Sequence, residues 1–345
     1  ENPREIEPLL VDAYMARRAL DYLVGFNISP ILWTKLPGSK SAGRVQSVAL
    51  KLITEREHEI ELFNPEEFWT LSIRFNDSDN KSLLASISQL NNNKIEKFSF
   101  KNKIEINKAI DQVKSKKFQI SDISSKVVNR NPSGPFTTST LQQVSSGRLS
   151  FGASRTMQIA QKLYQGIEID GETIGLITYM RTDGTNLSND AIETFRKYIK
   201  SEFGEEYIPD SPANYAGKKA KNAQEAHEAI RPTDIVRTPN TVKKYLSPDQ
   251  YKLYDLIWSR ALSSQMRPAQ FDRNTITITS DDNGTICKAS GSVIKFDGFL
   301  RIFKDNKKDD DEDILPEMKK GPINIEALLD EQHFTQPPPR YSEAS

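Results

Sequence analysis

At Phe68 the spacing of apolar residues changes from a helical repeat to strict alternation, and this change constrains the fold more than any other feature. Before it, the spacing predicts helices over about residues 8–24 and 42–61. After it, every second side chain is apolar: Trp69, Leu71, Ile73 and Phe75. Such a pattern is typical of a strand with one buried face. The chain therefore combines a helical part with a β-rich part, in which short strands are expected to about residue 129 and a helix over residues 105–115.

The middle of the chain returns to helical spacing. Residues 137–165 predict two helices joined by a turn between Gly147 and Gly152, with Ser154 capping the second helix. A strand that carries Tyr179 is expected next, so the order is helix, turn, helix, strand, as in winged-helix domains. Helices are predicted to begin at Ser188 and at 247–248, and strands resume from residue 270 with a hairpin turn at 282–284.

Charge is balanced over the 345 residues, with 47 basic and 47 acidic side chains. Zero net charge argues mildly against a nucleic-acid binder, but the distribution is uneven. Residues 126–165 contain no Asp or Glu, and their basic side chains could follow a phosphate backbone. The acidic run at residues 309–313 has neither the turn glycine nor the ligand spacing of a metal site, so we expect a solvated loop there.

A single cysteine, Cys287, excludes both a disulfide within the chain and a C-x-x-C zinc site. No apolar run approaches the roughly 18 residues of a membrane span, and no signal peptide is visible at Glu1. We therefore expect a cytoplasmic protein without a membrane partner. Because the first residue is Glu rather than Met, we also expect a piece of a longer polypeptide.

The segment GLITYMRTD, residues 175–183, is the strongest candidate for catalysis. On a strand, Tyr179, Arg181 and Asp183 would share one face. A phenol, with a reference pKa of about 10, is a poor nucleophile until a cation or a base stabilises the phenolate. An arginine keeps its proton, and its fork matches a phosphate. The pair fits attack on a phosphodiester, although taken alone it more often marks an edge strand with two amphipathic side chains.

Four further segments accompany this one: SAGRVQSVAL (41–50), PFTTSTLQQ (135–143), AQEAHEAIRPT (223–233) and QHFTQPPPRYSEAS (332–345). Together with YMRTD they follow the order found in type IA DNA topoisomerases, and the chain resembles the bacterial topoisomerase I branch over nearly its whole length. Met180 stands where the related topoisomerase III branch usually has Pro. Gly184 departs from the family pattern, in which Ser is commoner at that position.

The resemblance implies an α+β multidomain fold, the core of a type IA topoisomerase. Residues 1–67 and 331–345 would belong to a helical base domain, and residues 68–136 and 268–330 to a β-rich arch domain. Residues 137–267 would form a winged-helix (CAP-like) domain that carries Tyr179. The implied activity needs no ATP: the enzyme cuts single-stranded DNA through a 5′-phosphotyrosine link, passes a strand, reseals the break and relaxes negative supercoils.

The resemblance also implies roles for particular residues. Tyr179 would be the nucleophile, Arg181 would hold the scissile phosphate, and His227 would donate a hydrogen bond or pass a proton. The expected DNA- or nucleotide-binding residues are Arg17, Asp21, Ser41, Arg44, Gln46, Thr138, Gln142 and Arg231.

Simpler interpretations exist for several of these residues. Arg17 and Asp21 stand at i and i+4 of a predicted helix, which is the spacing of an ordinary ion pair. The Ser/Thr cluster at 137–139 is typical of a helix N-cap. A helix through AQEAHEAIRPT would place Gln224, His227 and Arg231 on one face, where a lone His is usually structural.

The family's magnesium ligands belong to an N-terminal acidic domain called Toprim, which this sequence does not contain. We therefore expect no metal bound by this chain, and Mg²⁺ and the Toprim domain in the full-length parent. The expected substrate is single-stranded or negatively supercoiled DNA, cleaved weakly or not at all by this chain alone. One alternative is a non-enzymatic winged-helix protein that binds single-stranded DNA. Another is a tyrosine recombinase, whose helical domain fits the predicted strand badly.

Overall fold

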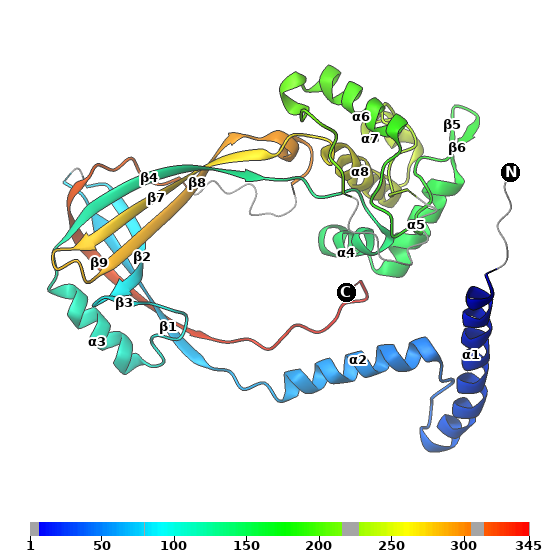
Figure 1. Cartoon of the computed structure of the whole chain (residues 1–345), viewed down its shortest axis with the longest axis horizontal. Helices are drawn as coiled ribbons and strands as arrows, with labels where there is room; N and C mark the ends of the chain where they lie inside the picture. The colour runs from blue at the N-terminus through cyan, green and yellow to red at the C-terminus, as the bar shows by residue number, and fades with distance from the viewer. Residues whose placement is uncertain (1–6, 79, 216–227, 305–313, 345) are drawn as a thin grey trace. The chain divides into compact units, whose positions relative to one another are not determined.

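A computed structural model describes residues 7–78, 80–215, 228–304 and 314–344 of the chain. The fold is mixed α/β with a large antiparallel sheet (Figure 1). The chain divides into two compact units: residues 1–66 with 335–342, and residues 67–334 with 343–345.

The first unit consists of two helices and a returning segment. Helix α1 (Pro8–Lys35) extends past the predicted end at residue 24, because apolar residues continue at helical spacing beyond Gly25. Helix α2 (Arg44–Glu61) confirms the second predicted helix. The returning segment is fixed on α2: the Arg340 guanidinium pairs with Glu57, and the Arg56 guanidinium lies 4.5 Å from the centre of the Tyr341 ring.

The second unit contains a seven-stranded antiparallel sheet in the order β1-β9-β4-β7-β8-β2-β3. Its strands are β1 (Glu67–Asn76), β2 (Ser82–Leu90), β3 (Asn93–Lys94), β4 (Phe118–Arg130), β7 (Ala269–Ser280), β8 (Ile286–Phe296) and β9 (Gly321–Phe334). An additional pairing between β1 and β2 closes the sheet on itself. The alternation that begins at Phe68 is confirmed, because Leu71, Ile73 and Phe75 are each at most 2% exposed.

Helix α3 (Lys103–Lys114) lies close to its predicted range and packs against this sheet. The Asn102 side chain caps it by accepting from the Glu105 amide. Ile106, Ala109 and Val113 are buried along one face of the helix. These side chains and the inward residues of the strands form one apolar core, here called the sheet core.

A separate apolar core, here called the helical core, gathers the helices in the middle of the chain. These are α4 (Thr138–Leu149), α5 (Ala153–Gln165), α6 (Asn189–Glu202), α7 (Pro239–Val242) and α8 (Pro248–Ser263), with short 3₁₀ turns η1 (Glu205–Tyr207), η2 (Lys243–Tyr245) and η3 (Gly298–Arg301). Three of the predicted helix starts are confirmed, since Thr137, Ser188 and Ser247 each accept a backbone N–H with the side-chain oxygen.

The turn between α4 and α5 differs from the prediction. Gly147 lies inside α4, and the left-handed residue that ends this helix is Ser150, with φ of 56°. Gly152, not Ser154, is the N-cap of α5, and it provides no side-chain cap. The strands that follow α5 are a two-stranded hairpin, β5 (Ile167–Ile169) and β6 (Glu172–Ile174), which ends before Tyr179.

Three strands connect the two cores. Phe118 and Ile120, near the start of β4, belong to the sheet core, and the chain beyond its end enters the helical core at Phe136. Strand β7 begins at Ala269 in the helical core and reaches the sheet core at Ile276. After β8 the chain returns to the helical core at η3. The predicted hairpin turn at 282–284 joins β7 to β8, with Asn283 at φ of 56°.

Candidate active site around Tyr179

The segment that carries Tyr179 is irregular, with bends at Thr178 and Met180, so the prediction of a strand is wrong. Residues 175–183 form a single bridge, between Ile177 and Pro232, instead of a ladder. The alternation of side chains nevertheless exists: Met180 and Thr182 are 1% and 6% exposed, whereas Arg181 and Asp183 face solvent. Threonine side chains and an isolated bridge take up hydrogen bonds of this backbone in place of a neighbouring strand.

Thr178 fixes the chain immediately before Tyr179. Its amide donates to the Arg231 carbonyl at 2.9 Å. Its hydroxyl donates to the Ala229 carbonyl at 2.7 Å and accepts from the Arg231 amide at 3.0 Å. One side chain therefore joins the segment before Tyr179 to the backbone of residues 229–231.

Thr138, at the start of α4, fixes the chain immediately after Tyr179. Its hydroxyl donates to the Met180 carbonyl at 2.8 Å and accepts from the Thr182 amide at 2.9 Å. Its own amide donates to the Thr182 carbonyl, also at 2.9 Å. The Thr138 hydroxyl is thus engaged in holding residues 180–182, so the geometry gives it a positioning role next to Tyr179. Its predicted contact with DNA stays a prediction.

The Tyr179 ring lies half-buried at the edge of the helical core. The Tyr164 ring on α5 packs edge-on against it, with centroids 5.4 Å apart and ring planes at 66°. Arg181 is exposed two residues later, and no described residue accepts a hydrogen bond from its guanidinium. A phenol on a braced backbone and a solvent-facing guanidinium therefore lie within one short segment.

The Arg231 guanidinium is less available for binding DNA than the sequence suggests. Its Nε donates to Glu228 Oε2 at 2.9 Å and its Nη2 to Oε1 at 2.8 Å, and Nη1 donates to the Pro232 carbonyl. Only 14% of its side chain is exposed. The carboxylate of Glu228 also accepts from the Ser188 amide. Arg231 and Glu228 together brace the residues opposite Thr178.

The helix predicted through AQEAHEAIRPT is wrong for its described part. Residues 228–232 are extended, with bridges from Ile230 to Phe136 and from Pro232 to Ile177. The predicted catalytic role of His227 and the predicted DNA contact of Arg231 stay predictions. His227 and Gln224 lie outside the described residues, whereas Arg231 is described and paired as above. Gln142 lies half-buried on α4, and its role in DNA binding stays a prediction.

A second group of predicted residues meets in the first unit. Arg44 Nε, at the start of α2, donates to Asp21 Oδ1 on α1 at 2.8 Å. This hydrogen bond, followed by the charges of Arg44 and Arg17, lowers the pKa of the Asp21 carboxyl. The expected i, i+4 pair of Arg17 with Asp21 is therefore replaced by a pair between helices. Ser41 and Gln46 are exposed nearby in sequence.

Sequence reasoning missed the bracing residues. Thr178 could have been found as the one polar side chain inside the apolar run GLIT, where a hydroxyl needs a buried partner. Glu228 follows His227 directly, but only the three-dimensional pairing reveals its use. No sequence signal places Glu228 against both Arg231 and Ser188.

Two absences hold for the described residues only. No group of three or more His, Cys, Asp or Glu side chains that could hold a metal ion gathers in them. None of their helices combines the length and the hydropathy needed to cross a membrane.

Comparison with known proteins agrees with the motifs. The chain matches the family described as DNA topoisomerase over residues 5–345. DNA topoisomerase 1 of Rickettsia felis is 50% identical over 349 residues, covering 100% of this chain and 45% of the relative. The enzyme of that name from Zymomonas mobilis is 47% identical over 354 residues, covering 100% of this chain and 28% of the relative.

A solved structure is similar as well. Full-length topoisomerase I from Thermotoga maritima superimposes with a TM-score of 0.77 at 36% sequence identity, covering 99% of this chain and 53% of that one. The chain thus spans about half, or less, of the length of these relatives. By its family match and these relatives, the chain belongs to the bacterial DNA topoisomerase I family.

Proposed function

We propose that this chain carries the cleavage tyrosine of a type IA topoisomerase, which cuts one DNA strand transiently and reseals it without ATP. The observation that supports the proposal best is the double brace around Tyr179. Thr178 and Thr138 hold the backbone on either side of the phenol, and the exposed Arg181 follows two residues later. Restraint of this kind places a nucleophile accurately at little entropic cost on binding.

The reaction is a transfer of one phosphoryl link. The Tyr179 phenol oxygen attacks the phosphorus, and a new bond forms between Tyr179 and the 5′ side of the break. The bond from phosphorus to the 3′ oxygen breaks, and that oxygen takes up a proton equivalent to the one lost by the phenol. Arg181 would stabilise the charge on the phosphate oxygens in the in-line transition state. Resealing is the reverse step, so bond energy is conserved.

The remaining predicted residues would bind the strand. Arg17, Asp21, Ser41, Arg44 and Gln46 would contact DNA from the first unit, and Thr138, Gln142 and Arg231 from the second. His227 would donate a hydrogen bond or pass a proton. Mg²⁺ would be held by a separate acidic domain of the full-length protein. The whole enzyme would pass a strand through the break and relax negatively supercoiled DNA in the bacterial cytoplasm.

A covalent-trapping experiment tests the proposal. The chain is mixed with a single-stranded oligonucleotide labelled at its 3′ end, with magnesium, and with or without the family's acidic domain added in trans; the mixture is then denatured. We expect a labelled protein adduct in the presence of the added domain. Tyr179→Phe should abolish it, because phenylalanine has no oxygen to form the link.

The neighbouring tyrosine gives the matched control. Tyr164→Phe keeps the ring that packs on Tyr179 and should leave the adduct in place. An adduct that persists in Tyr179→Phe would refute the assignment of the nucleophile. Binding of the oligonucleotide without any adduct, even with the acidic domain, would refute the cleavage function of this chain.

A further inference from the structure

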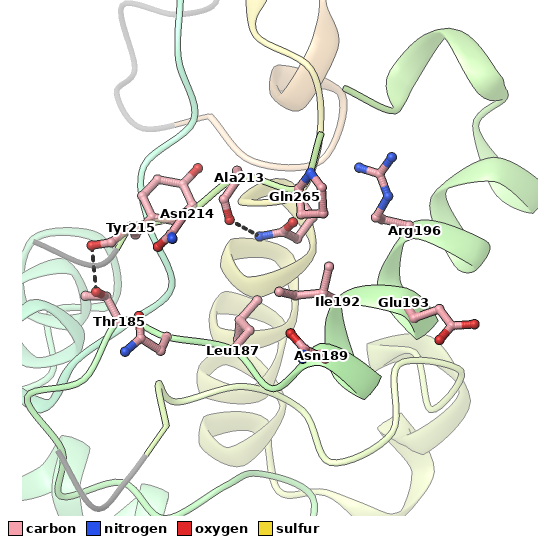
Figure 2. Close-up of a pocket in the computed structure, with 12 residues that line it drawn as sticks. Thr185, Leu187, Asn189, Ile192, Glu193, Arg196, Ala213, Asn214, Tyr215 and Gln265 are labelled. Atoms are coloured by element: carbon pink, nitrogen blue, oxygen red, sulfur yellow. Dashed lines mark hydrogen bonds between the residues drawn. The ribbon is translucent and has the colours of Figure 1, made fainter. Parts of the chain in front are cut away.

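An open groove lies on strand β9, in a part of the second unit that the tyrosine site does not use. The pocket beside α6 (Figure 2) is a different feature: the loop that follows the tyrosine segment lines it, including Thr185 and Leu187, so we count it with the tyrosine site. The groove on β9 has a volume of about 600 Å³. One wall is helix α3, including Asn107, and the other is residues 325–328 of β9 with Asp330.

One edge of β9 is unpaired over most of its length. The strand pairs with β1 from Asn324 to Phe334, but its pairing with β4 on the other edge is limited to residues 321–323. Beyond Ile323, no strand in the described part of the chain is hydrogen-bonded to that second edge. Alternate residues of an antiparallel strand direct N–H and C=O away from their partner. The edge therefore presents backbone groups that can pair with another chain.

The groove extends onto this unpaired edge. Ile325 and Leu328 lie opposite core residues of β1, so their side chains point to the face of the sheet on which α3 packs. Glu326 is the extra residue of a β-bulge, and Ala327 lies opposite the exposed Arg74, on the other face. Both of these residues also line the groove. Because residues of both faces line it, the groove includes the edge between them, where an extended peptide can add as a further strand.

The charges of the lining favour a basic ligand and oppose a nucleic acid. Three carboxylates line the groove: Asp111, Glu326 and Asp330. Lys114 supplies the one ammonium among these lining residues, and its Nζ lies 3.9 Å from Asp111, whose side chain is 77% exposed. Lys103 pairs with Asp330 from outside the lining. The remaining surplus of negative charge would repel phosphates and attract a basic side chain.

We propose that this groove binds an extended segment of a partner protein, in which aliphatic and basic side chains alternate. The segment would add to the sheet as a strand beside β9. Its aliphatic side chains would cover the half-buried Ile110 and Leu328, and its basic side chains would neutralise the surplus carboxylates. The groove belongs to the sheet core, whereas Tyr179 packs on the helical core, so the inference does not depend on the proposed function.

Model peptides test the inference by fluorescence anisotropy. The probe is a labelled six-residue peptide of alternating valine and lysine, blocked at both ends, which matches the roughly 17–20 Å of strand that the groove covers. We expect it to bind at least about tenfold more tightly than a peptide of alternating valine and glutamate. Methylating the valine amides removes the N–H donors of one strand edge, and methylating the lysine amides removes those of the other. One of these two peptides should lose binding, and the other should keep it.

Two variants at exposed positions of α3 place the binding in the groove. Asp111→Lys reverses a charge of the lining, and Asn107→Trp fills the space beside it; each should weaken binding of the valine-lysine peptide by about tenfold or more. Glu96→Lys is the matched control, because Glu96 is also exposed and also lies near a lysine, 3.7 Å from Lys94, but outside the groove. It should leave the affinity unchanged. Thermal unfolding of each variant establishes that it is folded.

Amide hydrogen exchange tests whether the peptide adds as a strand. A saturating concentration of the valine-lysine peptide should slow exchange at alternate amides of β9 beyond Ile323, because they gain hydrogen-bond partners. The amides of β1 that already pair with β9 or β2 should not change.

Several results would overturn the inference. Equal affinities in the parent and in both α3 variants would place the peptide elsewhere, and equal affinities of the lysine and glutamate peptides would remove the charge argument. Unchanged exchange in β9 would exclude strand addition. Displacement of the peptide by a single-stranded oligonucleotide in Asp111→Lys and the parent alike would assign the surface to DNA. Dimerisation in light scattering, with protected β9 amides and no peptide binding, would assign the edge to a second copy of this chain.

Discussion

Two threonines determine the position of the candidate nucleophile, and both act through hydroxyl groups that bond to backbone. Thr178 and Thr138 each use one Oγ1 as donor and acceptor at once. This arrangement joins an irregular segment to α4 and to residues 229–231 without a neighbouring strand. At the residue scale, the site therefore depends on atoms that carry no charge and take no part in the reaction.

Thr138→Val tests this dependence. Valine has nearly the same shape, but it leaves the Thr182 amide and the Met180 carbonyl without the hydroxyl. We expect a loss of about 1–3 kcal/mol in the free energy of unfolding, and adduct formation slower by about ten- to a hundredfold because the phenol is misplaced. Urea unfolding and the rate of adduct formation measure the two effects. Ser139→Ala, at the next and exposed position of α4, is the control and should change neither.

The residues of the site were predictable to an uneven degree. The phenol of Tyr179 and the guanidinium of Arg181 single out one segment in the sequence, and their catalytic roles stay predictions. The pair of Asp21 with Arg44 does not, because a spacing of i, i+4 suggested Arg17, whereas the contact that forms joins two helices. Arg231 illustrates the same limit. Its residue type predicts that it binds a phosphate, and only the fold reveals that its guanidinium pairs with the Glu228 carboxylate.

At the scale of elements, a sequence pattern succeeded wherever side-chain spacing or capping decided the outcome. The strand from Phe68, helix α3 and the starts of α4, α6 and α8 are examples. It failed at Tyr179, because side chains that alternate between apolar and polar predict a strand whether or not a partner strand exists. It also failed at Ser154, because the N-cap of α5 lies two residues earlier, at Gly152.

The hairpin of β7 and β8 gives a prediction about pH. Asp282 in its turn accepts from the Lys116 ammonium at 2.8 Å, from the Ser280 hydroxyl and from the Gly284 amide. These contacts, that with Lys116 foremost, lower the pKa of the Asp282 carboxyl well below its usual range. Because the folded pKa is depressed, this stabilisation is complete above the unfolded pKa of about 3.9 and is lost as pH falls toward the folded value.

Asp282→Asn should therefore be less stable than the parent at neutral pH, and the difference should shrink as pH falls below about 4. Urea unfolding from pH 7 to pH 2.5 measures it. Asp281→Asn changes the adjacent carboxylate, which lies outside the Lys116 pair. Its difference from the parent in the free energy of unfolding should not shrink in the same way as pH falls. A difference between Asp282→Asn and the parent that is constant with pH would contradict the role of the Lys116 pair.

At the scale of the whole second unit, the connection between the two cores depends on one close backbone approach. Gly298 begins η3 with φ of 49°, and a Cβ placed there would lie 2.6 Å from the Arg267 carbonyl and 2.7 Å from that of Pro268. Around it, the Tyr207 hydroxyl donates to Asp297 at 2.8 Å, and Arg267 Nε donates to the Ile208 carbonyl at 2.7 Å. This junction anchors β7 and β8 in the helical core.

Gly298→Ala should loosen that anchor. The added methyl meets rigid backbone and a left-handed φ, and we expect a cost of about 2–4 kcal/mol. Amide hydrogen exchange should accelerate in α8 and at the start of β7, while β1 and β2 in the sheet core keep their protection. Gly171→Ala, at the exposed tip of the β5–β6 hairpin with φ of 89° and no atom within 4 Å of its Cβ, supplies a control for backbone strain alone. Equal losses in both variants would contradict the anchoring role of Gly298.

The strands that join the two cores have a mechanical consequence. A loop between domains swings freely, but β4, β7 and β8 are hydrogen-bonded to one another along most of their length. Any displacement of the helical core against the sheet core must bend or twist this ribbon, and the paired strands resist in proportion to the displacement. The ribbon is therefore an elastic connection. When the helical core, with Tyr179, is displaced against the sheet core, the deformed strands supply a force that restores its position.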